Sequence, residues 1–140
     1  MAEYIRRAHY HETDRMGIIH HANYVKWMEE ARIAYLDGIG ISYKKMEEAG
    51  VVSPVTGISV EYLKPVFFDD EIGITVTVGK YTGVVLELAY TFRNLTTDEI
   101  SSTAVSKHCF LSNGRIVSLK RALPGVHETL LSQMPAQPER

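Results

Sequence analysis

Apolar positions recur with two different periods along the chain of 140 residues, and the period changes near Gly50. Before that glycine, apolar side chains recur every three or four positions from Tyr24 to Tyr35, which is the spacing of one face of an α-helix. The pattern predicts a long helix with Asn23 as its N-cap and an end near Asp37, ahead of two glycines. A shorter helix is expected over residues 42–49, capped by the serine that begins it.

After Gly50, apolar and polar residues alternate, which is typical of half-buried β-strands. Short polar turns, of which Asn113-Gly114 is the clearest, separate these segments and favour antiparallel pairing. Together with an N-terminal segment, the expected strands cover residues 4–10, 58–62, 72–78, 86–92, 101–111 and 115–119.

One long helix followed by antiparallel strands predicts an α+β domain over residues 1–123. Residues 124–140 are expected to add a short helix over 126–134 and a disordered tail from Pro135. A single helix covers one face of such a sheet, so the other face and the edges are expected to meet a second copy of the chain.

Composition and charge exclude several classes of protein. The formal net charge is −2 and the sequence pI is about 6.3, so no global basic field attracts the chain to nucleic acid or to an anionic membrane. No apolar run approaches the ~18 residues of a membrane helix, and the polar N-terminus lacks the apolar stretch of a signal peptide. The single cysteine, Cys109, excludes an intramolecular disulfide and a CxxC motif, and we expect a cytoplasmic location.

The segment from Glu12 to Tyr24 links the first predicted strand to the long helix and contains most of the candidate chemistry. It places Asp14 shortly before a helix N-terminus, where free backbone N–H groups can stabilise an oxyanion. Asp14 would then attack a carbonyl carbon directly or through water. The structural alternative is that Asp14 makes a turn that Gly17 permits.

Two pairs of histidines are further candidates. His20 and His21 are adjacent, so their side chains point in different directions in a first helical turn, and we expect one of them to be functional. His21 can hydrogen-bond a substrate carbonyl, a water molecule or Asp14, or it can simply satisfy the helix terminus. His9 and His11, on one face of the first strand, raise a metal hypothesis together with the later pair. No HxxxH or carboxylate–histidine helix motif accompanies them, so neither a metal nor another cofactor is expected.

Other chemistries lack their motifs. The segment from Gly57 to Glu61 falls short of GxSxG because it ends in Glu, so a serine hydrolase is not expected. The chain contains neither GxGxxG nor a Walker A sequence, so it has no nucleotide-phosphate loop. Cys109 follows His108 in a predicted strand, where the two side chains point to opposite faces, and we expect the cysteine to be a small buried apolar residue.

The stretch from Thr13 to Arg32 resembles the hotdog-fold acyl-CoA thioesterases of the 4-hydroxybenzoyl-CoA thioesterase type. A second stretch from Val60 to Pro65, with Asp69-Asp70 after it, is similar to that family's second characteristic segment. The resemblance covers about residues 4–123. It implies the hotdog fold, an antiparallel sheet wrapped around one long helix, assembled as a homodimer or homotetramer with active sites between subunits.

By position, the resemblance implies that Asp14 is the catalytic carboxylate, that the backbone N–H of His20 contacts the oxyanion, and that His21 matches a histidine of many members. His20 departs from the family, where Tyr or another residue is more frequent, and adds a titratable group beside the site. A thiol has a pKa near ~8.5, against ~16 for water, so a thiolate leaves with little acid assistance. One carboxylate and an oxyanion site therefore suffice for hydrolysis.

The resemblance implies an acyl-CoA substrate, hydrolysed to the free acid and coenzyme A. The acyl group is expected near the helix start, against Gly17, Tyr24, Trp27 and Met28. Local cations are expected to bind the phosphates of coenzyme A, and the candidates are Lys64, Arg93, Arg115, Lys120 and Arg121. Two alternatives stay open, an acyl-carrier-protein thioesterase and a non-catalytic acyl-CoA binding module, and Asp14 argues against the second.

Overall fold

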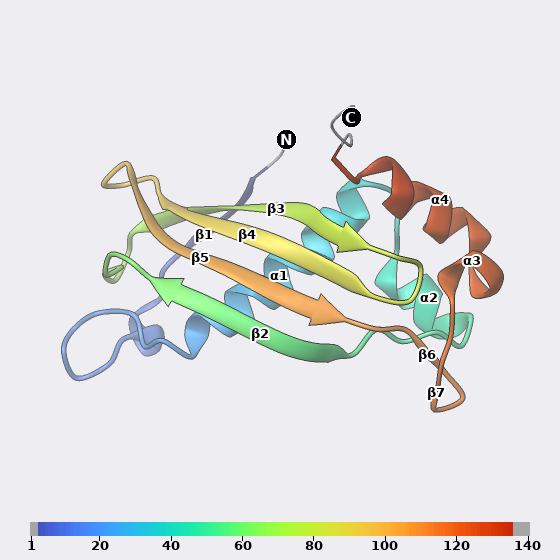
Figure 1. The fold of residues 1–140 in the computed structure, drawn as a ribbon. Coiled ribbons are helices and arrows are strands. Elements are labelled where there is room, and N and C mark those ends of the chain that lie inside the picture. Colours follow the sequence, from blue (N-terminus) through green and yellow to red (C-terminus); the bar gives the residue numbers. More distant parts are fainter. Residues whose placement is uncertain (1–2, 136–140) are drawn as a thin grey trace. The chain divides into compact units, whose positions relative to one another are not determined.

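A computed structural model describes residues 3–135 of the chain. Its elements, in chain order, are β1 (Tyr4–Arg7), the 3₁₀ helix η1 (Tyr10–Glu12), α1 (Asn23–Gly38), α2 (Tyr43–Glu48), β2 (Val55–Tyr62), β3 (Glu71–Tyr81), β4 (Leu86–Asn94), β5 (Glu99–His108), β6 (Leu111–Ser112), β7 (Arg115–Ile116), α3 (Leu119–Ala122) and α4 (Pro124–Ser132). Five strands form one sheet in the order β1-β3-β4-β5-β2, and β6 pairs with β7 (Figure 1). The chain is α+β, as its patterning predicts.

The described residues fall into two compact units, of which the first contains the start of α1. This unit comprises the residues up to Tyr35 together with Ser59–Val76 and Tyr90–Val105. The ring of Tyr24 lies 5.2 Å from that of Trp27 and 5.5 Å from that of Phe92 in β4. The apolar stripe predicted for the long helix is therefore the face that α1 buries against the sheet in this unit.

The second unit comprises Leu36–Ile58, Thr77–Ala89 and the residues from Ser106 onward. Ser42 caps α2 as predicted, since its hydroxyl accepts the Lys45 N–H at 3.2 Å. The hydroxyl of Tyr81, at the end of β3, lies 2.6 Å from Nδ1 of His127 in α4. This buried contact joins the last helix of the described chain to a strand of the same unit.

Three predicted boundaries are wrong. The first strand ends at Arg7 rather than at residue 10, because the chain turns into η1 where the Glu12 carboxylate accepts the His9 N–H. Asn23 is the first residue of α1 rather than its N-cap, because its side-chain amide donates to the Glu12 carbonyl. The last strand stops at Ile116, and Leu119 begins α3.

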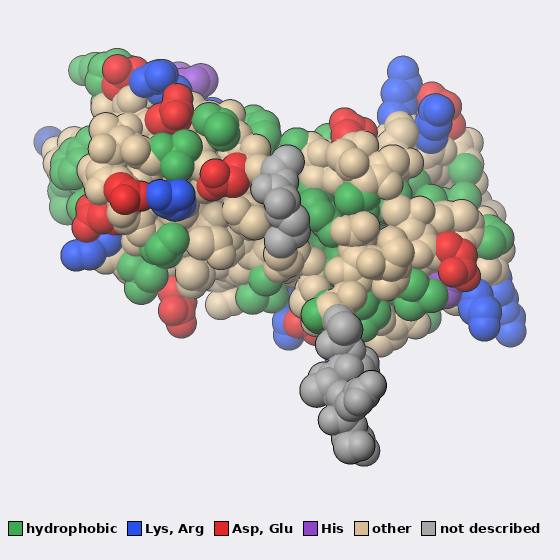
Figure 2. Space-filling view, turned by 90° about the horizontal axis from the view of Figure 1, so that it is seen from above, with side chains coloured by type: hydrophobic (Ala, Val, Ile, Leu, Met, Phe, Trp, Pro, Cys, Tyr) green, Lys and Arg blue, Asp and Glu red, His purple; other side chains and the backbone are tan. Residues whose placement is uncertain are grey.

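The remaining predicted elements are confirmed within a few residues, including α4 for the short C-terminal helix. The tail predicted from Pro135 lies, except for its first residue, outside the described residues. Among residues 3–135, no helix combines the length and the apolar character that crossing a bilayer requires. On the face shown in Figure 2, acidic and basic side chains are interspersed without a large field of one sign.

Candidate active site

The segment from Thr13 to Ile19 forms a tight hairpin in the first unit that fixes the backbone of Asp14. Thr13 pairs with Ile19 in an antiparallel bridge, and the Asp14 N–H donates to the Ile18 carbonyl at 2.8 Å. Gly17 closes the turn by donating to the Asp14 carbonyl at 3.1 Å, with a φ of 81° that glycine adopts without strain. Backbone hydrogen bonds therefore determine where Asp14 lies.

Asp14 is half-buried, and only one of its two carboxylate oxygens is hydrogen-bonded within the described residues. One oxygen accepts the Met16 N–H at 2.8 Å, an Asx-type contact within the turn. The other oxygen accepts no hydrogen bond from the described residues. The structural interpretation of Asp14 as a turn residue is confirmed, and the same geometry leaves one carboxylate oxygen free for chemistry.

Glu12 anchors this hairpin with a carboxylate that is only 4% exposed. Nη1 of Arg6 contacts its two oxygens at 2.8 and 2.9 Å, the indole N–H of Trp27 donates at 2.9 Å, and the His9 N–H donates at 2.8 Å. Burial raises the pKa of Glu12, but the hydrogen bonds from Arg6, Trp27 and the His9 N–H outweigh it and hold the pKa below its ordinary value of 4.5. Glu12 is therefore an ionised, fully hydrogen-bonded buried carboxylate.

The backbone carbonyl of Glu12 connects the hairpin to the start of α1. It accepts the His20 N–H at 2.8 Å and the side-chain amide of Asn23 at 2.9 Å. Glu12 is therefore held by Arg6 and Trp27 through its carboxylate, and it holds the start of α1 through its backbone carbonyl.

Most of the backbone N–H groups from His20 to Tyr24, around the start of α1, are hydrogen-bonded within the protein. The His21 N–H has no acceptor among the described residues. Four neighbouring N–H groups have acceptors within the protein at 2.8 to 3.3 Å, those of His20, Ala22, Asn23 and Tyr24. The structure therefore corrects the prediction that the His20 N–H contacts the oxyanion, because that donor is bonded to the Glu12 carbonyl and the free donor belongs to His21.

The side chain of His20 also has a structural role. Its Nδ1 accepts the Ala22 N–H at 3.1 Å, so the imidazole caps the helix start. Its ring stacks on that of His21, with centroids 4.3 Å apart and planes 25° apart. Of the two adjacent histidines, His20 supports the turn and His21 faces the cavity described next.

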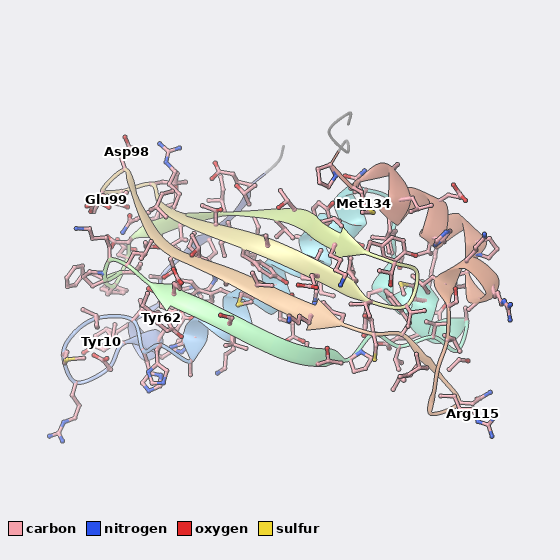
Figure 3. All side chains as sticks on the ribbon, viewed as in Figure 1. Tyr10, Tyr62, Asp98, Glu99, Arg115 and Met134 are labelled. Atoms are coloured by element: carbon pink, nitrogen blue, oxygen red, sulfur yellow. The ribbon has the colours of Figure 1, made fainter. Side chains whose placement is uncertain are left out.

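A cavity of about 470 Å³ opens beside the hairpin and the helix start. Its lining residues all belong to the first unit, and they are Asp14, Met16, Ile18, Ile19, His21, Tyr24, Tyr62, Leu63, Lys64 and Pro65. Tyr62, at the end of β2 in Figure 3, stands edge-on to Tyr24, with ring centroids 5.1 Å apart. Burial raises the pKa of Tyr24 to about 12, so its hydroxyl stays neutral. The walls are mostly apolar, with one carboxylate and one lysine.

The cavity brings together four of the residues predicted from the sequence, namely Asp14, His21, Tyr24 and Lys64. Trp27 and Met28 were expected in the acyl pocket, but they are not among the lining residues and lie in the core. Helical periodicity gives the buried face of a helix and does not separate the residues of a pocket wall from those of the core. Gly17 shapes the turn and is not among the lining residues.

The predicted phosphate-binding cations are dispersed. Lys64 lines the cavity, whereas the exposed Arg93 pairs with Asp98 in the turn that follows β4. The other three candidates belong to the second unit, and they are Arg115 in β7 and Lys120 and Arg121 in α3. Lys64 is the predicted cation that the structure associates with the cavity.

The metal hypothesis finds two ligands at most. Nδ1 of His9 and Nε2 of His11 lie 3.4 Å apart on the exposed surface, and neither His20 nor His21 joins them in a metal-binding group. Among residues 3–135, no group of three or more His, Cys, Asp or Glu side chains could hold a metal ion. A catalytic zinc site uses three protein ligands, so this histidine pair alone does not form one.

The fold is that of a known class of enzymes. The profile of the thioesterase-like superfamily matches residues 8–134, and the chain belongs to that family. It is a thioester hydrolase with the hotdog fold, as the sequence resemblance implies.

Individual relatives are similar over most of the chain. A Bacillus subtilis protein named "Putative acyl-CoA thioesterase YneP" is 34% identical over 120 residues, which cover 84% of this chain and 86% of that protein. The crystal structure of a DHNA-CoA thioesterase from Staphylococcus aureus superimposes with a TM-score of 0.90 at 32% identity, covering 94% of this chain and 89% of the other. The acyl-CoA thioester hydrolase YbgC of Escherichia coli is 31% identical over 80 residues, which cover 57% of this chain and 60% of that protein.

Proposed function

We propose that this protein hydrolyses the thioester of an acyl-coenzyme A to a free acid and coenzyme A, with Asp14 as the reacting carboxylate and the His21 N–H as the donor to the carbonyl oxygen. The observation that carries the proposal is that a carboxylate oxygen and a backbone N–H, neither of which has a hydrogen-bond partner among the described residues, belong to residues lining the same cavity. The names of YneP, YbgC and the DHNA-CoA thioesterase support an acyl-CoA substrate.

Each group has a distinct task in the reaction. The His21 N–H, at the positive end of the α1 dipole, stabilises the negative charge that develops on the thioester oxygen. Asp14 attacks the carbonyl carbon to form an anhydride that water then hydrolyses, or it removes a proton from the water that attacks. In both routes the C–S bond breaks and coenzyme A leaves as a thiolate, which takes up a proton from solvent.

The other cavity residues bind the two parts of the substrate. Apolar and aromatic walls, including Tyr24 and Leu63, suit an acyl group, and Lys64 supplies a positive charge for a phosphate of coenzyme A. The exposed edge strand β2 supports assembly with a second copy, as the resemblance implies, and we propose a homodimer or homotetramer.

The test is thiol release, followed with DTNB, from a panel of short, medium, long and aromatic acyl-CoAs. We expect Asp14→Asn to lower turnover by about 10²–10⁴-fold, because it removes the base or nucleophile without changing the shape of the side chain. Asp37→Asn makes the same chemical change at an exposed residue of the last turn of α1 and is expected to match the wild type. Near-wild-type turnover of Asp14→Asn on every active substrate contradicts the assignment. Absence of release by the wild type would instead favour carrier-protein thioesters, and then a binding module.

A His21→Ala variant separates the imidazole from the backbone. The substitution leaves the N–H in place, so any loss of rate reports a role of the ring in positioning water or the carbonyl. We expect a loss of about 10²-fold in kcat. A loss below about threefold would leave the backbone N–H as the whole contribution of residue 21.

A further inference from the structure

Tyr62 connects strand β2 to the turn that carries the free N–H. Its hydroxyl donates to the backbone carbonyl of His21 at 3.0 Å. Its ring stands edge-on to Tyr24 at 5.1 Å and to the imidazole of His21 at 6.3 Å. The residue is 49% exposed, so the hydroxyl contact, rather than burial, directs it toward the helix start.

Hydrogen bonds hold the backbone on both sides of the His21 N–H. On one side, the His20 N–H is bonded to the Glu12 carbonyl at 2.8 Å, and the His20 carbonyl, which shares a peptide group with the His21 N–H, accepts the Asn23 N–H at 3.0 Å. On the other side, the His21 carbonyl accepts the Tyr62 hydroxyl at 3.0 Å and the Tyr24 N–H at 3.3 Å, the latter beyond the usual range for an N–H donor. The Tyr62 hydroxyl is therefore the shorter of the two bonds that fix the carbonyl side of His21.

We propose that Tyr62 is a positioning residue for thioester hydrolysis, which holds the His21 carbonyl and, together with the Asn23 N–H on the His20 carbonyl, sets the direction of the His21 N–H. The inference rests on the proposed function. An oxyanion donor acts most strongly on charge that appears in the transition state, so its misalignment lowers kcat more than it weakens substrate binding. The ring of Tyr62 lines the cavity independently of its hydroxyl, so substrate contacts persist when only the oxygen is removed.

The experiment compares Tyr62→Phe with Tyr10→Phe, since both tyrosines are labelled in Figure 3 and both substitutions remove one hydroxyl. Tyr10 is 73% exposed, and its hydroxyl makes no hydrogen bond with the described residues. We expect kcat of Tyr62→Phe to fall about tenfold, the value of one hydrogen bond in a site where small displacements matter, with KM within about twofold of the wild type. Tyr10→Phe should match the wild type. An unchanged kcat in Tyr62→Phe, or an effect on KM alone, overturns the proposal.

A second readout does not depend on turnover. In ¹⁵N-resolved amide hydrogen exchange, Tyr62→Phe is expected to accelerate exchange at Ala22 and Tyr24, whose N–H groups are hydrogen-bonded within the turn, relative to both the wild type and Tyr10→Phe. If the wild type released no thiol from any acyl-CoA, the proposed function would fail and these amides would still decide whether Tyr62 orders the turn. Unchanged exchange and amide shifts at both positions overturn the positioning role.

Discussion

Replacing Glu12 by Gln tests whether the buried carboxylate organises the site. Each of its oxygens accepts two donors, since Arg6 Nη1 reaches both, the His9 N–H reaches one and the Trp27 indole reaches the other. An amide of the same shape must turn its NH₂ toward one of these pairs of donors. Two hydrogen bonds are then lost, and the two donors face the amide N–H groups instead of an acceptor. The negative charge opposite Arg6 also disappears.

The expected magnitude follows from the burial of this pair. Breaking a buried ion pair by removing one partner costs ~3–5 kcal/mol. Arg6 keeps a second carboxylate, Glu30, at 3.0 Å from its Nε, so the lower end of that range applies. We expect Glu12→Gln to lose about 3 kcal/mol of unfolding free energy, or about 10 °C in Tm for a chain of this size.

The assay is urea unfolding of Glu12→Gln beside Glu29→Gln. Glu29 is an exposed residue of α1 whose side chain makes no hydrogen bond or ion pair with the described residues, and its substitution should stay within about 0.5 kcal/mol of the wild type. A loss below about 1 kcal/mol in Glu12→Gln would refute the reasoning, because leaving buried donors without an acceptor costs more unfolding free energy than that.

The same carboxylate makes stability depend on acid. The pKa of Glu12 is lower in the folded state than its ordinary value of 4.5, so its contribution is present above pH 4.5 and is lost as the pH falls through the folded pKa. Glu12→Gln should therefore show a weaker loss of stability between neutral and acid pH than the wild type.

Three further predictions concern base, assembly and charge. Burial raises the pKa of Tyr24 and of Tyr81 to about 12, so these tyrosines ionise in the unfolded chain at a lower pH than in the folded one. Stability should therefore fall as the pH rises from 10 toward 12. An ultraviolet titration in which all tyrosines ionise together near pH 10 would contradict this. Light scattering at micromolar concentration should give a dimer or tetramer of the 15.8 kDa chain, because the edge strand β2 is exposed on both faces, and a monomer would contradict it. Lys64→Ala should raise KM for acyl-CoA about two- to fivefold at low salt and less at high salt. Lys44→Ala, in the second unit, should leave KM unchanged. An effect of Lys64→Ala that does not depend on salt would exclude a phosphate contact.

The helix and the strands could be predicted because their periodic side chains are the ones that they bury. Trp27 marks the centre of the apolar stripe of α1 and is fully buried, and the alternation over 72–78 marks the buried face of β3. Periodicity failed where a polar contact between distant segments determines the backbone. The first strand ends early because Glu12 collects donors from β1 and α1, and neither donor adjoins it in the sequence.

The residues of the candidate site were also predicted only in part, because some of its contacts join segments that are distant in the sequence. Asp14 and His21 stand in a short segment whose residue types and spacing indicate their chemistry, and both line the cavity. The free N–H was assigned to His20 because the sequence does not show that the Glu12 carbonyl occupies that donor. Tyr62 lay inside the second stretch of family resemblance, but its hydroxyl contact depends on how the end of β2 meets the helix start.

The hairpin that carries Asp14 separates what holds the carboxylate from what surrounds it. The hydrogen bonds that close the hairpin and the bond from the Met16 N–H all come from the main chain, while the side chains of Met16 and Ile18 only line the cavity. Residues at these two positions can therefore change in size without moving the carboxylate, so the range of accepted acyl groups can diversify, by evolution or by design, while the chemical step is inherited intact.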